Sequence, residues 1–120
     1  QTHNDTLTLM HAPIQQFLEQ PELAELIRVG GINPNELTEA EWFRFGHYWM
    51  MQFNMYDYLY LAHLDEAVVP SLWIGTDASW RNVFENEPGV RRAWREWRHS
   101  FADPFQSYVD SLVEEIEDAN

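Results

Sequence analysis

The sequence predicts an all-α domain of five or six helices, arranged like a bundle around one long helix at about residues 39–67. Apolar residues recur at spacings of three and four along most of the chain, as in helices with one buried face. Proline or glycine separates these segments, and no segment of four or more residues alternates as a half-buried strand would. The 120 residues, 15% of them aromatic, suffice for one core, so we expect a single domain over residues 1–120 and exclude a disordered chain.

Two helices are predicted before the first glycine pair. Residues 6–19 place apolar side chains three or four positions apart, at Leu7, Met10, Ile14, Phe17 and Leu18. Pro13 inside this segment predicts a kink or a restart. Pro21 then opens a short helix over Glu22–Val29. We expect Gly30 and Gly31 to stop it, because glycine accepts the left-handed conformation that often follows a helix.

The longest helix follows a turn at residues 33–35. Thr38 and Glu41 have the spacing of a capping box, in which each side chain bonds the other residue's backbone N–H. A stripe of rings then recurs at helical spacing: Trp42, Phe45, Trp49, Phe53, Tyr56 and Tyr60. A second apolar line consists of Phe43, Met50, Leu61 and Leu64. A helix that is apolar over most of its circumference belongs at the centre of a bundle.

Three more segments complete the predicted fold. Residues 70–86 form a helix that a break at residues 75–77 would divide, with Asp77 capping the shorter piece; the sequence does not decide between these. Residues 89–101 follow the boundary at Pro88 and Gly89. Asp103 is predicted as an N-cap before Pro104, which would begin a last helix over residues 104–118.

The charge of the chain limits its ligands. Twenty acidic residues oppose seven basic ones, all of them arginine, for a formal net charge of −13. Direct binding of nucleic acid needs an excess of basic residues and is therefore not expected. An acidic chain could instead mimic nucleic acid, and this remains an alternative. The absence of cysteine excludes disulfides and thiolate zinc sites.

No metal site or cofactor is expected. Histidines that share one ion on a helix usually lie three or four residues apart. None of the five histidines has that spacing; they are His3, His11, His47, His63 and His99. The sequence also lacks a phosphate-binding glycine loop and a nucleophile elbow.

The long helix carries a polar line of His47, Asn54 and Asp57. Such groups on an apolar helix need partners, because an unpaired buried polar group costs about 1–3 kcal/mol. One interpretation is an internal hydrogen-bond network, with Arg44 or an arginine from residues 91–98 as partner of Asp57. The other is a ligand-binding pocket walled by rings, with these residues and Arg44 as its polar end.

A cluster of arginines lies before, between and after the last two tryptophans. Arg91, Arg95 and Arg98 share one helix face beside Trp94 and Trp97. They could form an anionic-ligand or lipid-binding surface. The alternative is that they pair with carboxylates at Glu85, Glu87 and residues 114–118.

Several short motifs occur in a recognisable order over about residues 15–115. They are Pro21-Glu22-Leu23-Ala24, Leu37 to Glu41 with Arg44-Phe45, Asp57, Pro88 to Arg91 with Trp94, and Phe101, Phe105 and Tyr108-Val109-Asp110. With these motifs the chain resembles a family of small uncharacterised bacterial proteins, in which a membrane helix precedes an all-helical domain. The family acid is usually Glu, where this chain has Asp57. The resemblance implies a membrane anchor before Gln1, a cytoplasmic location that could be the inner-membrane face, and no particular activity.

The aromatic content bears on partners. Six Trp, five Tyr and seven Phe are more than a small core needs, so we expect a homo-oligomer, such as a homodimer, or a protein partner. The leading hypothesis is a non-enzymatic protein-interaction or sensory module. The alternative is a small-ligand binder or enzyme that uses the polar line at His47, Asn54 and Asp57.

Overall fold

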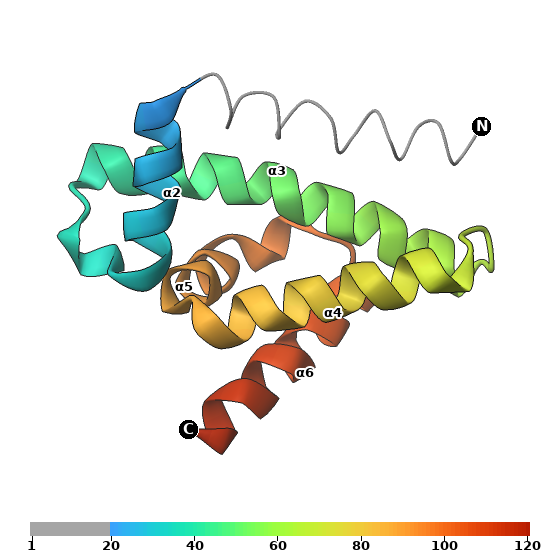
Figure 1. Cartoon of the computed structure of the whole chain (residues 1–120). Coiled ribbons are helices and arrows are strands. Elements are labelled where there is room, and N and C mark those ends of the chain that lie inside the picture. Colours follow the sequence, from blue (N-terminus) through green and yellow to red (C-terminus); the bar gives the residue numbers. More distant parts are fainter. Residues whose placement is uncertain (1–19) are drawn as a thin grey trace.

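The computed structural model describes residues 20–120, which form helices and turns without a β-strand in that range (Figure 1). The elements are α2 (Pro21–Ile32), η1 (Pro34–Glu36), α3 (Glu39–Leu64), α4 (Pro70–Asn86), α5 (Pro88–Trp97), η2 (Arg98–Ser100) and α6 (Asp103–Ala119), where η denotes a short 3-10 helix. The predicted all-α fold is confirmed. The helix expected at residues 6–19, with Pro13, lies outside the described residues, as do His3 and His11.

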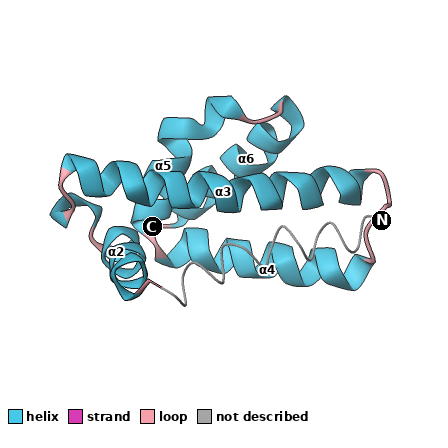
Figure 2. Ribbon diagram, turned by 90° about the horizontal axis from the view of Figure 1, so that it is seen from above, coloured by secondary structure: helices cyan, strands magenta, loops and turns pink. Residues whose placement is uncertain are grey.

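The long helix α3 is central, as predicted. α4 runs alongside α3, and α5 and α6 pack against both (Figures 1 and 2). The predicted ring stripe faces these neighbours: Trp42, Phe45, Trp49, Phe53 and Tyr56 are buried, and Tyr60 is partly buried. Phe53 lies in the middle of the core, with ring centroids 5.4 Å from Trp94, 5.6 Å from Trp80, and 6.0 Å from Phe84 and Phe101.

The ends of α3 follow from local hydrogen bonds. The predicted capping box is present: Thr38 Oγ1 accepts from the Glu41 backbone N–H at 3.1 Å, and the Glu41 carboxylate accepts from the Thr38 N–H at 2.8 Å. The helix ends at Leu64, before the predicted residue 67. The chain turns there through Glu66, whose φ of 56° cannot continue a right-handed helix.

The second apolar line of α3 does not widen the buried face as predicted. Phe43 and Leu64 are 61% and 52% exposed, and Met50 and Leu61 are partly buried. Phe43 points about 100 degrees away from Trp42 around the helix axis. Because α4, α5 and α6 pack on the ring stripe, Phe43 remains at the surface.

The prediction that Gly30 and Gly31 stop a helix is wrong, because α2 continues through both to Ile32. Both glycines are buried where α2 crosses the start of α5. A Cβ added to Gly89 of α5 would lie 1.8 Å from the Gly30 carbonyl oxygen. Gly89 therefore allows α5 to approach the backbone of α2 closely, whereas the absent Cβ of Gly30 leaves room for the Phe45 ring, 2.4 Å from where that Cβ would lie.

The remaining boundaries also differ from the predictions in detail. α4 runs unbroken through residues 75–77, so Asp77 caps no shorter helix. α5 ends at Trp97 and is followed by η2, where the sequence predicted one helix over residues 89–101. The N-cap of α6 is Ala102, so Asp103 lies in the first helical turn beside Pro104. Asp103 still suits that place, because an acidic side chain is favourable at a helix N-terminus.

Two glycine substitutions are expected to have opposite effects. Gly75→Ala should stabilise the fold by about 0.5–1 kcal/mol, because Gly75 lies inside α4 with open space around the new Cβ. Gly46→Ala in α3 should destabilise it by about 1–3 kcal/mol, because the Cβ would lie 2.1 Å from the Trp97 ring. Urea unfolding of both variants measures these changes. A stabilising Gly46→Ala would contradict the close packing of Trp97 on α3.

Candidate functional site

The predicted polar line of α3 does not converge on one cavity. His47 and Asn54 are exposed, whereas Asp57 is partly buried. His47 and Asp57 are about 15 Å apart along the helix axis. Arg44 and His47 line a shallow hollow with Phe43, to which neither Asn54 nor Asp57 contributes. The structure thus brings Arg44 and His47 together and leaves the other two residues elsewhere.

Asp57 faces the start of α6. Burial raises the pKa of its carboxyl group, and the backbone N–H of Ala102 partly opposes that shift. Its Oδ1 has no hydrogen-bond partner among the described residues, and no ion pair joins it to Arg44 or to the arginines of α5 in that part of the chain. The charged form of Asp57 therefore weakens the fold at neutral pH.

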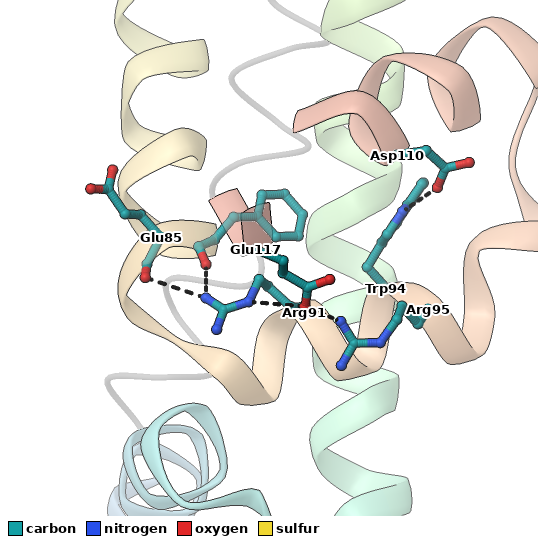
Figure 3. A network of polar contacts seen from close by, with 7 residues as sticks. Glu85, Arg91, Trp94, Arg95, Asp110 and Glu117 are labelled. Atoms are coloured by element: carbon teal, nitrogen blue, oxygen red, sulfur yellow. Dashed lines mark hydrogen bonds and ion pairs between the residues drawn. The ribbon is translucent and has the colours of Figure 1, made fainter. Parts of the chain in front are cut away.

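Arg91 and Arg95 of α5 bind a carboxylate of α6 (Figure 3), and Arg98 of η2 binds another. Glu117 lies 2.5 Å from Arg95 Nη1 and 3.5 Å from Arg91 Nε. The guanidinium of Arg98 makes a two-point contact with Asp110. This is the pairing alternative of the sequence analysis, with Glu117 and Asp110 as the acids. It leaves less free positive charge for an anionic-ligand surface at Arg91, Arg95 and Arg98.

The same network joins α4, α5 and α6. Arg91 also donates to the backbone carbonyls of Phe84 and Glu85 at the end of α4, and Trp94 Nε1 donates to Asp110 at 2.9 Å (Figure 3). Glu85 thus contributes its carbonyl and not the predicted carboxylate. Glu87 lies beside Gly31, where burial raises the pKa of its carboxyl group. These contacts fix the helices relative to one another.

A second polar cluster, which the sequence reasoning missed, lies between α3, α4 and α6. Asp77 Oδ1 accepts hydrogen bonds from the hydroxyls of Tyr56 at 2.7 Å and Tyr108 at 2.5 Å. Asp77 Oδ2 accepts from Arg81 Nε at 3.1 Å. The spacing of Asp77 and Arg81, four residues apart on one helix, was the available signal. The tyrosines come from other helices, and no local pattern links them to Asp77.

The hydrogen bonds of this cluster set its protonation. Burial alone would raise the pKa of Asp77, but the donors Tyr108, Tyr56 and Arg81 together hold it below its usual value. Burial and the Asp77 carboxylate raise the pKa of Tyr56. The cluster therefore contains a charged Asp77 and neutral phenols. Tyr56 is fully buried and the Asp77 side chain is only 17% exposed, so this arrangement suits structural support better than catalysis.

The N-terminal end of α3 borders a hollow that we call the Trp42 hollow. The hollow has a volume of roughly 760 Å³, and its lining is mostly apolar. The lining residues are Glu39, Ala40, Trp42, Phe43, Arg44, Glu96 and Trp97. The Trp42 ring is fixed on several sides: it stacks on Trp97 at 5.8 Å, its Nε1 donates to Glu96 at 2.8 Å, and the Arg92 guanidinium lies 4.3 Å from its centroid.

A second depression, which we call the acidic groove, adjoins the Trp42 hollow through the shared residue Arg44. Leu26, Val29 and Leu37 form its apolar part. Its acidic residues are Glu22, Glu25, Glu36 and Glu41. α2, η1 and the first turn of α3 thus supply one continuous surface with an apolar floor and a charged rim.

Neither a metal site nor a membrane-spanning helix is found among residues 20–120. No group of three or more His, Asp or Glu side chains there could hold a metal ion. No helix in the described part of the chain is long and apolar enough to cross a membrane.

Comparisons with protein-family models, with curated proteins and with solved structures find no match to this chain. The resemblance to a family of uncharacterised bacterial proteins is therefore wrong. Its motifs are packing and capping signals, which unrelated helical chains share. The N-terminal membrane helix that the resemblance implied has no support.

Proposed function

We propose that this chain is a non-enzymatic protein-interaction module, which binds a partner through the Trp42 hollow and the adjoining acidic groove. The observation that carries the proposal is Phe43, a large aromatic side chain that is 61% exposed at the edge of a mostly apolar hollow. Apolar hollows with exposed aromatic side chains are typical of protein-binding surfaces.

The rigidity of the hollow supports this proposal. Trp42 and Trp97 are held by stacking, by the hydrogen bond to Glu96 and by the Arg92 guanidinium. Trp97 also lies against α3 at Gly46, where a Cβ would have no room. A surface that is ordered before binding loses little entropy when a partner docks, so more of the contact energy contributes to affinity.

The other polar groups of the fold offer less to a reaction. Asp77 and Asp110 each accept hydrogen bonds from neighbouring helices, and His47 and Asp57 lie too far apart to act together. A catalytic site needs an acid, base or nucleophile within reach of a substrate cavity. The polar clusters at Asp77 and Asp110 join helices to one another, and His47 lines its hollow without Asn54 or Asp57, which favours binding over catalysis.

Photo-crosslinking in the source cells tests the proposal. Photoreactive benzoyl-phenylalanine in place of Phe43 should give a discrete adduct with another protein on illumination, identifiable by mass spectrometry. The matched control carries the same group in place of Ile74, which is 67% exposed on α4. We expect no such adduct from position 74. The absence of an adduct at position 43, or the same adducts at both positions, would contradict the proposed function.

A further inference from the structure

The apolar and charged residues of the proposed binding surface indicate which kind of partner segment would fit it. The Trp42 hollow and the acidic groove share Arg44, so one extended ligand could cover both. Trp42, Phe43 and Leu37 offer apolar contact along the two depressions. The rim of the two depressions carries carboxylates at Glu22, Glu25, Glu36, Glu39, Glu41 and Glu96.

These carboxylates differ in how far they are already engaged. Glu25 pairs with Arg28, Glu41 caps α3, and Glu96 accepts from Trp42. Glu22, Glu36 and Glu39 are exposed and make no hydrogen bond or ion pair with other side chains within residues 20–120. Among residues 20–120, Glu22 and Glu39 are therefore free to meet an incoming ligand, and Glu36 is offset only by attraction to the nearby Arg28.

The positive charges nearby offset only part of this rim. Arg28 is bound to Glu25, and Arg92 lies over the Trp42 ring. Arg44, at the junction of the two depressions, remains for an acceptor on the ligand. The formal net charge of −13 also attracts cationic and repels anionic ligands at long range.

We infer that the partner docks a cationic amphipathic segment here, with a bulky apolar side chain in the Trp42 hollow and Lys or Arg side chains over the acidic groove. This inference rests on the proposed function and adds the chemistry of its ligand. An amphipathic helix fits best, because its apolar face would meet the floor while its flanking basic residues reach the rim. A purely apolar segment would leave Glu22 and Glu39 without a counter-charge among residues 20–120.

A defined peptide tests this inference on the full chain. The probe is a fluorescent amphipathic helix of about 16 residues built from Lys, Leu and one Trp, long enough to cover several helical turns. Its comparison peptide has Glu in place of every Lys. Fluorescence anisotropy should show binding of the basic peptide, weaker binding as NaCl rises from about 0.05 to about 0.3 M, and no binding of the acidic one.

Two matched triple variants locate the contact. Glu22→Gln, Glu36→Gln and Glu39→Gln together should weaken binding about tenfold, as expected from the loss of three exposed ion pairs. Glu114→Gln, Glu115→Gln and Asp118→Asn on α6 remove the same charge elsewhere and should change affinity less than about twofold. Circular dichroism and thermal melting verify that both variants fold. Phe43→Ser should weaken binding with the charges left intact.

Each contrary outcome has a distinct meaning. Equal effects of the two triple variants, or binding of the acidic peptide, would overturn the inference about partner chemistry. If an adduct still formed at position 43, the interaction function would stand with a different kind of ligand. An adduct joined to a second copy of this chain, or to its own residues, would overturn the inference in favour of self-association or internal docking.

Discussion

The substitution Gly89→Ala is expected to lower the free energy of unfolding by about 3 kcal/mol, the largest effect expected from adding a methyl group at any of the five glycines. The new Cβ would lie 1.8 Å from the carbonyl oxygen of Gly30 and 2.8 Å from its carbonyl carbon. Both atoms belong to the backbone of α2, so no side-chain rotation can relieve the overlap. α2 must shift away from α5, and its buried residues Leu26 and Ile27 lose packing.

Two matched glycine variants separate this effect from helix propensity. Gly31→Ala places a Cβ 2.1 Å from Glu87 Oε1, the end of a flexible side chain that can move aside. Gly75→Ala meets no atom. We expect the loss of stability in urea unfolding to be large for Gly89→Ala, smaller for Gly31→Ala and reversed for Gly75→Ala. If Gly89→Ala unfolded at the same urea concentration as the parent chain, the α2–α5 crossing would not be as close as described.

Replacing Asp77 with leucine is expected to cost about 3 kcal/mol of stability. The change leaves the hydroxyls of Tyr56 and Tyr108 without their acceptor and removes the ion pair with Arg81. Tyr56 is fully buried, so water cannot replace the lost acceptor without opening the core. Adding Tyr56→Phe to Asp77→Leu should recover part of the lost stability. Two apolar side chains at positions 56 and 77 cost less than a buried Tyr56 hydroxyl without an acceptor. A double-mutant cycle in urea measures this coupling.

The same cluster predicts how stability depends on pH. The pKa of Asp77 is lowered in the folded chain. The stability that Asp77 contributes is therefore fully present above the ordinary aspartate pKa of about 4. It is lost as the pH falls through the lower pKa that Asp77 has in the folded chain. Asp77→Asn should remove that part of the acid dependence. Asp57 and Glu87 act in the opposite sense, because burial raises their pKa and their protonation relieves a cost of folding. A parent and a variant with parallel stability curves below about pH 4 would contradict the assignment to Asp77.

The sequence was sufficient for those features that depend on neighbours along the chain. Helical spacing identified α3 and its buried rings, and the Thr38 capping box placed its first turn. The sequence was insufficient for features that depend on contacts between residues of different helices. Glycine pairs look alike whether they end a helix or leave room for a neighbouring side chain, and only the positions of Phe45 and Glu87 decide the roles of Gly30 and Gly31.

The candidate site illustrates the same limit. Phe43 shares the helical spacing of core residues, yet the neighbours of α3 lie on the adjacent face. A cap was one of two alternatives for Asp77, because its partners Tyr56 and Tyr108 are 21 and 31 residues away in the sequence. The pairing of α5 arginines with acids of α6 was one of the alternatives. Each arginine of a small acidic chain has many carboxylates within reach, so pairing needs few geometric constraints.

The continuous ring packing around Phe53 has a consequence for how this protein can change over generations. Phe53 contacts rings from α4, α5 and the η2–α6 connection, and Tyr56 stacks on Trp80 at 4.7 Å. Altering one ring changes the space available to those beside it, so the effects of paired substitutions here should not add. We expect divergent descendants of this chain to exchange these aromatic positions in correlated groups, while isolated replacements are selected against.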